Sequence, residues 1–146
     1  MSELLKVFFN LEQDEDGYPG VSVESVWAIP TADNSVVKLD NVPFFTYEAT
    51  IDDLIRVHEE DGKLWFQEVL TESINSMFRI LFFDIDVKDK VRDHLVGMGC
   101  VTELFASRKL LAVSVPGPAL LFPVREYLKS ERDAGSIDVE EAIVRE

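Results

Sequence analysis

The amino-acid sequence predicts an α+β protein made of two lobes. Short β-rich runs separated by turn residues fill the first half, whereas the second half alternates apolar strands with helical periodicity. The chain has 146 residues, 47% of them hydrophobic, which is enough for one or two packed cores. We therefore expect an acidic β lobe at residues 1–76 and an α/β lobe at residues 77–146. No Gly/Ser/Pro-rich linker separates them, so we expect the two lobes to pack as one unit.

The first half contains short predicted strands joined by turns. Residues 5–11 form a β-rich run that ends at an acidic turn containing Gly17, and a strand with alternating side chains follows at residues 21–27. Further strands are expected at residues 36–39 and 64–70, while residues 51–58 fit either a short helix or a strand. Five or six short strands in this length favour a small sheet or barrel-like lobe.

The second half predicts a ferredoxin-like lobe. It opens with an apolar strand at residues 77–85, of the kind that is buried on both faces. A helix follows, because apolar residues recur at helical spacing: Val87, Val91, Leu95 and Met98. The remaining elements are a hairpin around Arg108–Lys109, a second helix at residues 119–135, and one or two helical turns at residues 136–146. The order β-α-β-β-α is most of a split β-α-β unit.

Negative charge is the strongest compositional signal, and it is uneven. The formal net charge is −14. Residues 1–76 contain 16 acidic and 4 basic side chains, whereas residues 77–146 contain 12 acidic and 10 basic ones. Such a charge repels nucleic acid and anionic membranes and attracts basic partners. The simpler interpretation is that the acidity only keeps a Phe-rich domain soluble.

The sequence predicts a cytoplasmic protein. No apolar run reaches the roughly 18 residues of a membrane span, and the N-terminus lacks a basic stretch followed by an apolar segment. The single cysteine, Cys100, cannot form an internal disulfide bond. It begins an apolar strand, where a buried and unreactive thiol is expected.

The acidic turn near the N-terminus has part of the spacing of a calcium-binding loop. With Gly17 at the sixth position of an EF-hand loop, Glu12, Asp14 and Asp16 occupy the first, third and fifth positions. The twelfth position, which needs a bidentate Glu, is then Val23. Because that ligand completes the cation cage, we expect neither a metal nor another cofactor here.

The segment that ends in Asp84 and Asp86 resembles the first motif of haloacid-dehalogenase-like phosphotransferases. The resemblance implies a nucleophilic Asp84, a general-acid Asp86 and a magnesium ion. Only 60 residues follow, which is too few for the rest of such an enzyme. We expect instead that Asp86 caps the next helix and that Asp84 is solvated. A Mg-dependent phosphohydrolase is therefore the least favoured function.

Histidines and aromatic residues offer no catalytic arrangement in the sequence. His58 and His94 fall in different lobes, which does not suggest a shared metal site. Most of the aromatic residues in the β lobe are expected in the core, and one or two in a partner-facing patch. They are Trp27, Phe44, Phe45, Tyr47, Trp65 and Phe66.

Several short motifs occur together in order along the chain. They include Asp16-Gly17-Tyr18-Pro19, Glu24-Ser25-Val26-Trp27-Ala28 and Leu39-Asp40-Asn41-Val42-Pro43-Phe44-Phe45, followed by Asp53. In this pattern the chain resembles a bacterial family known only as a domain of unknown function. The resemblance spans most of the chain and implies no activity. Turn formers and aromatics dominate the pattern, which favours a role in maintaining the fold.

These observations favour a non-enzymatic protein-binding module, most concretely an immunity protein that neutralises a basic bacterial toxin such as a nuclease. Acidic side chains would imitate phosphates and speed association with a basic partner. The candidate partner-binding residues lie in two acidic turns, expected at one end of the β lobe: Asp14, Glu15, Asp16, Glu59, Glu60 and Asp61. The alternative is a small-molecule-binding or regulatory α+β domain, which only fold analogy supports.

Overall fold

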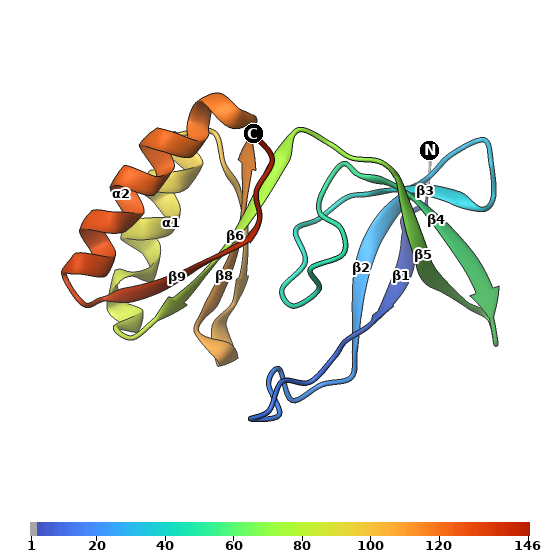
Figure 1. Cartoon of the computed structure of the whole chain (residues 1–146), viewed down its shortest axis with the longest axis horizontal. Coiled ribbons are helices and arrows are strands. Elements are labelled where there is room, and N and C mark those ends of the chain that lie inside the picture. Colours follow the sequence, from blue (N-terminus) through green and yellow to red (C-terminus); the bar gives the residue numbers. More distant parts are fainter. Residues whose placement is uncertain (1–2) are drawn as a thin grey trace. The chain divides into compact units, whose positions relative to one another are not determined.

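The computed structural model describes residues 3–146, and the chain divides into two compact units (Figure 1). Unit 1 is Met1–Ser73 and unit 2 is Ile74–Glu146. The division falls after residue 73, close to the expected boundary after residue 76. That the two units pack together as one remains a prediction.

Unit 1 is a closed ring of five strands. They are β1 (Leu5–Asn10), β2 (Val23–Pro30), β3 (Val36–Leu39), β4 (Leu54–Glu60) and β5 (Lys63–Thr71). Each strand pairs with the next in antiparallel fashion, and β1 closes the ring by pairing with β5 in parallel. An odd number of strands in an up-and-down ring requires one such parallel pair. The open choice at residues 51–58 is settled, since this segment contributes β4.

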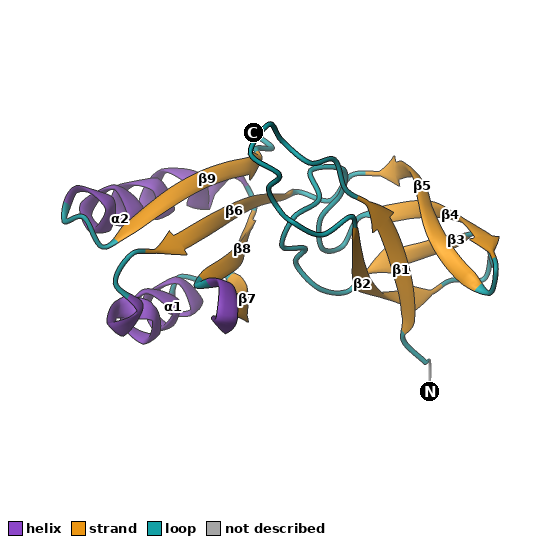
Figure 2. Cartoon of the chain, turned by 90° about the horizontal axis from the view of Figure 1, so that it is seen from below, coloured by secondary structure: helices purple, strands orange, loops and turns teal. Residues whose placement is uncertain are grey.

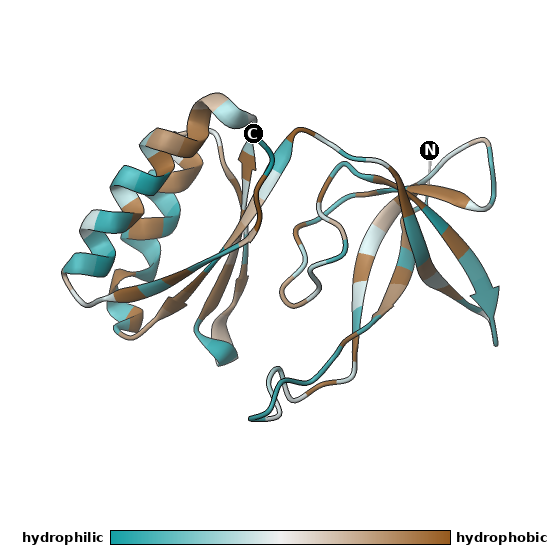
Figure 3. Ribbon diagram, viewed as in Figure 1, coloured by the Kyte–Doolittle hydropathy of each residue, from teal (hydrophilic) through white to brown (hydrophobic). Residues whose placement is uncertain are grey.

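Alternation along the strands places one set of side chains inside the ring. Along β2, Glu24, Val26 and Ala28 are buried and the residues between them are exposed. Successive side chains of a strand point to opposite faces, so a closed sheet collects one set as its core. The fully buried large side chains of this core include Val7, Phe9, Val26, Leu39 and Ile55. Figure 3 shows the resulting alternation of hydrophobic and hydrophilic residues along the strands.

Unit 2 is a four-stranded antiparallel sheet with two helices on one face (Figures 1 and 2). Its elements are β6 (Asn75–Phe82), α1 (Lys88–Gly97), β7 (Val101–Phe105), β8 (Leu110–Pro116), α2 (Leu121–Asp133) and β9 (Ile137–Ile143). The strand order is β7-β8-β6-β9. Alternate residues of β6 and β8 pack with Val91 and Leu95 of α1 and with Val124 and Leu128 of α2. The α+β class is therefore confirmed.

Two local predictions in unit 2 are wrong. The C-terminal segment predicted as helical turns is the strand β9, because its residues pair with β6 and Ile137 is buried in the core. The residue that caps the turn after β6 is Asp84, not Asp86. The Asp84 carboxylate accepts a hydrogen bond of 3.0 Å from the Asp86 backbone N–H, at the start of a 3₁₀ turn, Ile85–Val87, that leads into α1.

Within residues 3–146, no helix is long and apolar enough to cross a membrane. The longer of the two α-helices, α2, has 13 residues.

Candidate functional site

The two acidic turns predicted as partner-binding both lie in unit 1 and line separate hollows. In Figure 1 both turns lie on the lower side of the unit, and Figures 1 and 2 show them apart. The loop of residues 11–22, between β1 and β2, carries the first three candidates, and the β4–β5 turn carries the other three. All six side chains are exposed: Asp14, Glu15, Asp16, Glu59, Glu60 and Asp61. Asn10, the last residue of β1, lines both hollows.

The first hollow lies between the loop of residues 11–22 and the segment of residues 45–48, and has a volume of about 300 Å³. Three acidic and three aromatic side chains define it, and we call it the acidic hollow. They are Glu12, Asp14, Tyr18, Phe45, Tyr47 and Glu48. Of the six turn residues predicted from the sequence, only Asp14 lines this hollow.

Aromatic rings from both sides of the acidic hollow remain accessible. Phe45 is 8% exposed, whereas Tyr18 and Tyr47 are 50% and 57% exposed. The rings of Tyr18 and Phe45 meet edge to face, with 6.1 Å between their centroids. Tyrosines that are half exposed present an apolar ring together with a polar hydroxyl group, a combination that is frequent in binding surfaces.

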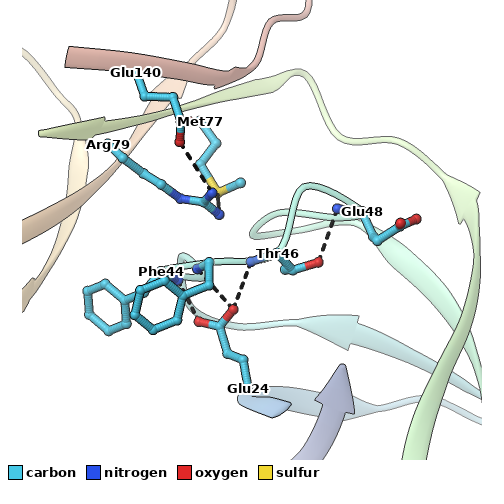
Figure 4. A network of polar contacts seen from close by, with 8 residues as sticks. Glu24, Phe44, Thr46, Glu48, Met77, Arg79 and Glu140 are labelled. Carbon is cyan, nitrogen blue, oxygen red and sulfur yellow. Dashed lines mark hydrogen bonds and ion pairs between the residues drawn. The ribbon is translucent and has the colours of Figure 1, made fainter. Parts of the chain in front are cut away.

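The carboxylate of Glu24 organises one wall of the acidic hollow. Glu24 is buried on β2, and its two oxygens accept backbone N–H hydrogen bonds from Phe44 at 2.6 Å, from Phe45 at 3.0 Å and from Thr46 at 2.9 Å (Figure 4). The Thr46 hydroxyl in turn accepts the backbone N–H of Glu48 at 3.1 Å. Hydrogen bonds to a carboxylate are among the strong ones, so this segment is held in one conformation.

Two further polar side chains fix the beginning and the end of the same long connection between β3 and β4. The Asn41 side chain accepts the Trp27 backbone N–H at 2.8 Å. The fully buried Asp53 accepts the backbone N–H groups of Thr50 at 3.0 Å and of Ser73 at 2.8 Å. Together with Glu24, these side chains satisfy backbone donors that neighbouring strands do not pair.

The opposite wall, the loop of residues 11–22, is also ordered by its own side chains. One Asp14 oxygen accepts the backbone N–H groups of Asp16 and Tyr18, both at 2.9 Å. The Gln13 side chain accepts the Gly20 N–H at 2.9 Å and donates to the Val21 carbonyl. The turn at Gly17 has a φ of 79°, where glycine is favoured. Both walls are therefore held by hydrogen bonds within unit 1.

None of the four cationic side chains of unit 1 lines the acidic hollow. Two pair with carboxylates: Lys38 with Asp52 at 3.7 Å and Arg56 with Glu68 at 3.6 Å. The other two lie over aromatic rings: Lys6 over Trp27 at 5.1 Å and Lys63 over Phe8 at 5.2 Å from the centroid. The negative charge of the acidic hollow is therefore not compensated by a cation of unit 1 among the described residues.

The second hollow lies beside the β4–β5 turn and differs in character. It is lined by Glu60 and Asp61 together with His58 and Trp65, and the His58 Nε2 lies 3.7 Å from a Glu60 oxygen. One aromatic ring lines it, where the acidic hollow has three. We therefore regard the acidic hollow, with its larger number of aromatic rings, as the stronger candidate for a binding site.

The residues considered for chemistry in unit 2 occupy structural positions. Asp84 and Asp86 are both exposed in the turn after β6, which Asp84 caps. His94 stacks on the Tyr127 ring, with 3.7 Å between the ring centroids. Cys100 is buried, and this burial raises its pKa to about 11, so its thiol is a poor nucleophile at neutral pH. Among residues 3–146, no group of three His, Cys, Asp or Glu side chains is placed to hold a metal ion.

Comparison with known proteins identifies the family. Residues 24–139 match the model of the family described as Domain of unknown function (DUF4265), and the chain belongs to this family. A crystal structure of a hypothetical protein from Neisseria gonorrhoeae has the same fold, with a TM-score of 0.79 at 18% sequence identity. The match covers 100% of this chain and 97% of that one. No curated protein matches the chain.

The structure explains the role of the sequence motifs on which the predicted resemblance rested. Glu24, Asn41 and Asp53 all accept backbone hydrogen bonds that hold the connection between β3 and β4. Sequence reasoning did not identify Glu48 or Tyr18 as site residues. Tyr18 is adjacent to the acidic turn, which was a usable signal, but nothing in the sequence places Glu48 opposite it.

Proposed function

We propose that the protein is a non-enzymatic, cytoplasmic binding module whose acidic hollow receives a basic partner protein. Its most concrete form is an immunity protein that neutralises a basic bacterial toxin, such as a nuclease. One observation carries the proposal: a preformed hollow with three carboxylates and three aromatic rings has no cation of its own unit beside it.

Long-range electrostatics support a basic partner. Unit 1 contains 16 acidic and 4 basic side chains, a formal charge of −12, whereas unit 2 has a formal charge of only −2. A field of this sign speeds association with a positively charged protein and repels nucleic acid. A nuclease binds phosphates through a basic surface. Exposed carboxylates of this protein would compete with phosphates for that surface.

The short-range construction of the hollow supports a specific contact as well. Interfaces draw most of their free energy from a few aromatic or Arg anchors that are surrounded by polar groups. The rings of Tyr18 and Tyr47 and the carboxylates of Glu12 and Glu48 provide such an arrangement. Because backbone N–H groups donate hydrogen bonds to the side chains of Glu24, Asp14 and Gln13 and so fix both walls, little ordering is needed on binding.

Unit 2 contributes a scaffold of known type to this proposal. Its β-α-β-β-α-β order and its β7-β8-β6-β9 strand order support the expected ferredoxin-like arrangement, on which many unrelated functions occur. The fold therefore adds no preference for one function, and the acidic hollow carries the proposal.

Toxin neutralisation in cells tests the proposal. The reading frame that adjoins this one in its genome is expressed in a bacterial host with and without this protein. We expect the neighbouring product to arrest growth alone, and the protein to restore growth and to co-purify with it. A neighbouring product that is harmless, or one that stays toxic and does not bind, contradicts the immunity function. Binding of a small metabolite and of no protein favours the ligand-binding alternative.

A further inference from the structure

We propose that the acidic hollow is a receptor for one arginine side chain of the partner. The guanidinium group lies against the tyrosine rings and pairs with the carboxylates of Glu12 and Glu48. This inference rests on the proposed function and goes further, because it names the chemical group that is recognised.

The size of the hollow limits its occupant. A volume of about 300 Å³ lies at the lower end of the range of ligand pockets and leaves room for one long side chain. The hollow is open to solvent along the exposed rings of Tyr18 and Tyr47. A single side chain that projects from a partner surface fits this space.

The lining selects a cation with an apolar body. Carboxylates alone would attract any cation, but three aromatic rings in the same hollow favour one that is weakly hydrated. The guanidinium group is planar, stacks on aromatic rings and pairs with a carboxylate through two parallel hydrogen bonds. The ammonium group of lysine is a compact and strongly hydrated charge, so it gains less from the rings.

The three carboxylates of the hollow have different roles. One oxygen of Asp14 already accepts two backbone N–H groups and orders the turn, so Asp14 is a positioning residue. Glu12 and Glu48 are exposed on the two opposite walls. They are the carboxylates that pair with the incoming guanidinium.

An NMR titration of the ¹⁵N-labelled full chain tests the inference. Three blocked peptides are compared: one alternating arginine with glycine, one with lysine in place of arginine, and one with citrulline, the uncharged isostere of arginine. We expect the arginine peptide to shift the amide signals of residues 12–18 and 45–48 and to bind about two- to fivefold more tightly than the lysine peptide. The citrulline peptide should not bind measurably.

Matched variants localise the effect. E48Q and Y47A are each expected to weaken the arginine peptide about two- to fivefold. E60Q, which makes the same chemical change at the other acidic turn, should leave its affinity within experimental error. The ¹⁵N spectra of the free variants show whether each is folded.

The possible failures separate the inference from the proposed function. Equal affinities for the arginine and lysine peptides, or shifts confined to residues 58–65, overturn the arginine receptor and leave a basic partner in place. No binding of either cationic peptide at low ionic strength contradicts both.

Discussion

Unit 1 and unit 2 contain similar numbers of acidic side chains, 16 and 12, but use them differently. In unit 2, carboxylates pair with nearby cations, as in Lys90–Glu131 at 2.9 Å and Arg125–Glu141 at 2.7 Å. The ion pair of Arg79 and Glu140, at 3.6 Å, is drawn in Figure 4. In unit 1, two buried carboxylates hold backbone segments, while those of the acidic hollow have no cation of the same unit beside them.

This difference means that the acidic hollow is not balanced by a cation of its own unit, whereas several carboxylates of unit 2 are paired. A domain that needed acidity only for solubility could pair its carboxylates, as unit 2 does. Unit 1 also pairs two of its four cations with carboxylates and holds the other two over aromatic rings, but none of the four lines the hollow. The contrast is therefore between a unit whose acidic and basic side chains nearly balance and a unit with a large excess of acidic side chains.

The largest expected effect concerns the apolar core of unit 2. Leu128→Ala removes a side chain that is 2% exposed and packs between α2 and the sheet. We expect a loss of about 2–5 kcal/mol in the free energy of unfolding, because transfer and cavity contributions add. Urea unfolding followed by circular dichroism at 222 nm reports on unit 2, which contains both α-helices of the described chain. Val96→Ala, on an exposed part of α1, is the control and should change stability by less than about 0.5 kcal/mol.

The next effect concerns the buried carboxylate of unit 1. Glu24→Ala leaves three backbone N–H groups without their acceptor, so we expect unit 1 to lose about 2–3 kcal/mol of stability. Tryptophan fluorescence measures this unit selectively, because both tryptophans, Trp27 and Trp65, lie in it. Glu12→Ala, in the acidic hollow, should cost less than about 0.5 kcal/mol. Equal losses of stability in Glu24→Ala and Glu12→Ala would mean that the hydrogen bonds to Glu24 do not hold the segment of residues 44–46.

Alkaline pH should destabilise unit 2 through two buried groups. Burial raises the pKa of Cys100 to about 11, and burial together with Glu131 raises the pKa of Tyr127 to about 12. The folded state therefore favours their protonated forms. The resulting contribution to the free energy of unfolding is complete below pH 9 and is lost as the pH rises through 11 to 12. Each group contributes a slope of at most about 1.4 kcal/mol per pH unit.

Urea unfolding followed by circular dichroism at 222 nm, repeated between pH 8 and pH 11, measures this dependence in the wild-type protein and in Cys100→Ala. The variant should lose stability less steeply, because only Tyr127 then remains in this range. An identical slope in the two proteins would show that the thiol has an ordinary pKa.

The smallest effect concerns the exposed ion pairs of unit 2. Lys129 and Asp133 are both 60% exposed and lie one helical turn apart, with 2.7 Å between Lys129 Nζ and an Asp133 oxygen. Lys129→Ala is expected to lower the stability of unit 2 less than any of the changes above, and added salt should reduce the difference further. Urea unfolding followed by circular dichroism at 222 nm measures the difference, and a loss as large as that of Leu128→Ala would contradict this expectation.

Local patterns predicted much of the fold. The alternation in the first half and the helical stripe through Val91 and Leu95 identified the β unit and α1, because these periods reflect which face is buried. The strand β9 was missed because Asp138, Glu140 and Glu141 give the segment a polar character that resembles a helix end. Only its pairing with β6 makes it a strand, and this long-range contact is invisible in a local reading.

The candidate site was predicted only in part. The charge excess of the first half and the acidic turn at Asp14 are local features of the sequence. The acidic hollow also needs Glu48, which is 34 positions further along the chain and is brought near by the hydrogen bonds of Glu24. The acidic turn could therefore be found from composition, and Phe45 and Tyr47 were already among the aromatic candidates for a partner-facing patch. Their position beside Asp14 required the structure.

The central claim is that the acidic hollow, not the negative charge of unit 1 in general, binds a basic partner. Fluorescence anisotropy with a labelled, blocked nona-arginine peptide tests it most directly, at one fixed ionic strength. The double variants E12Q/E48Q and E59Q/E60Q change the net charge by the same amount, so long-range attraction changes similarly in both. We predict that E12Q/E48Q weakens binding roughly tenfold and E59Q/E60Q less than about threefold. Equal losses in the two variants, or a larger loss in E59Q/E60Q, would contradict the account.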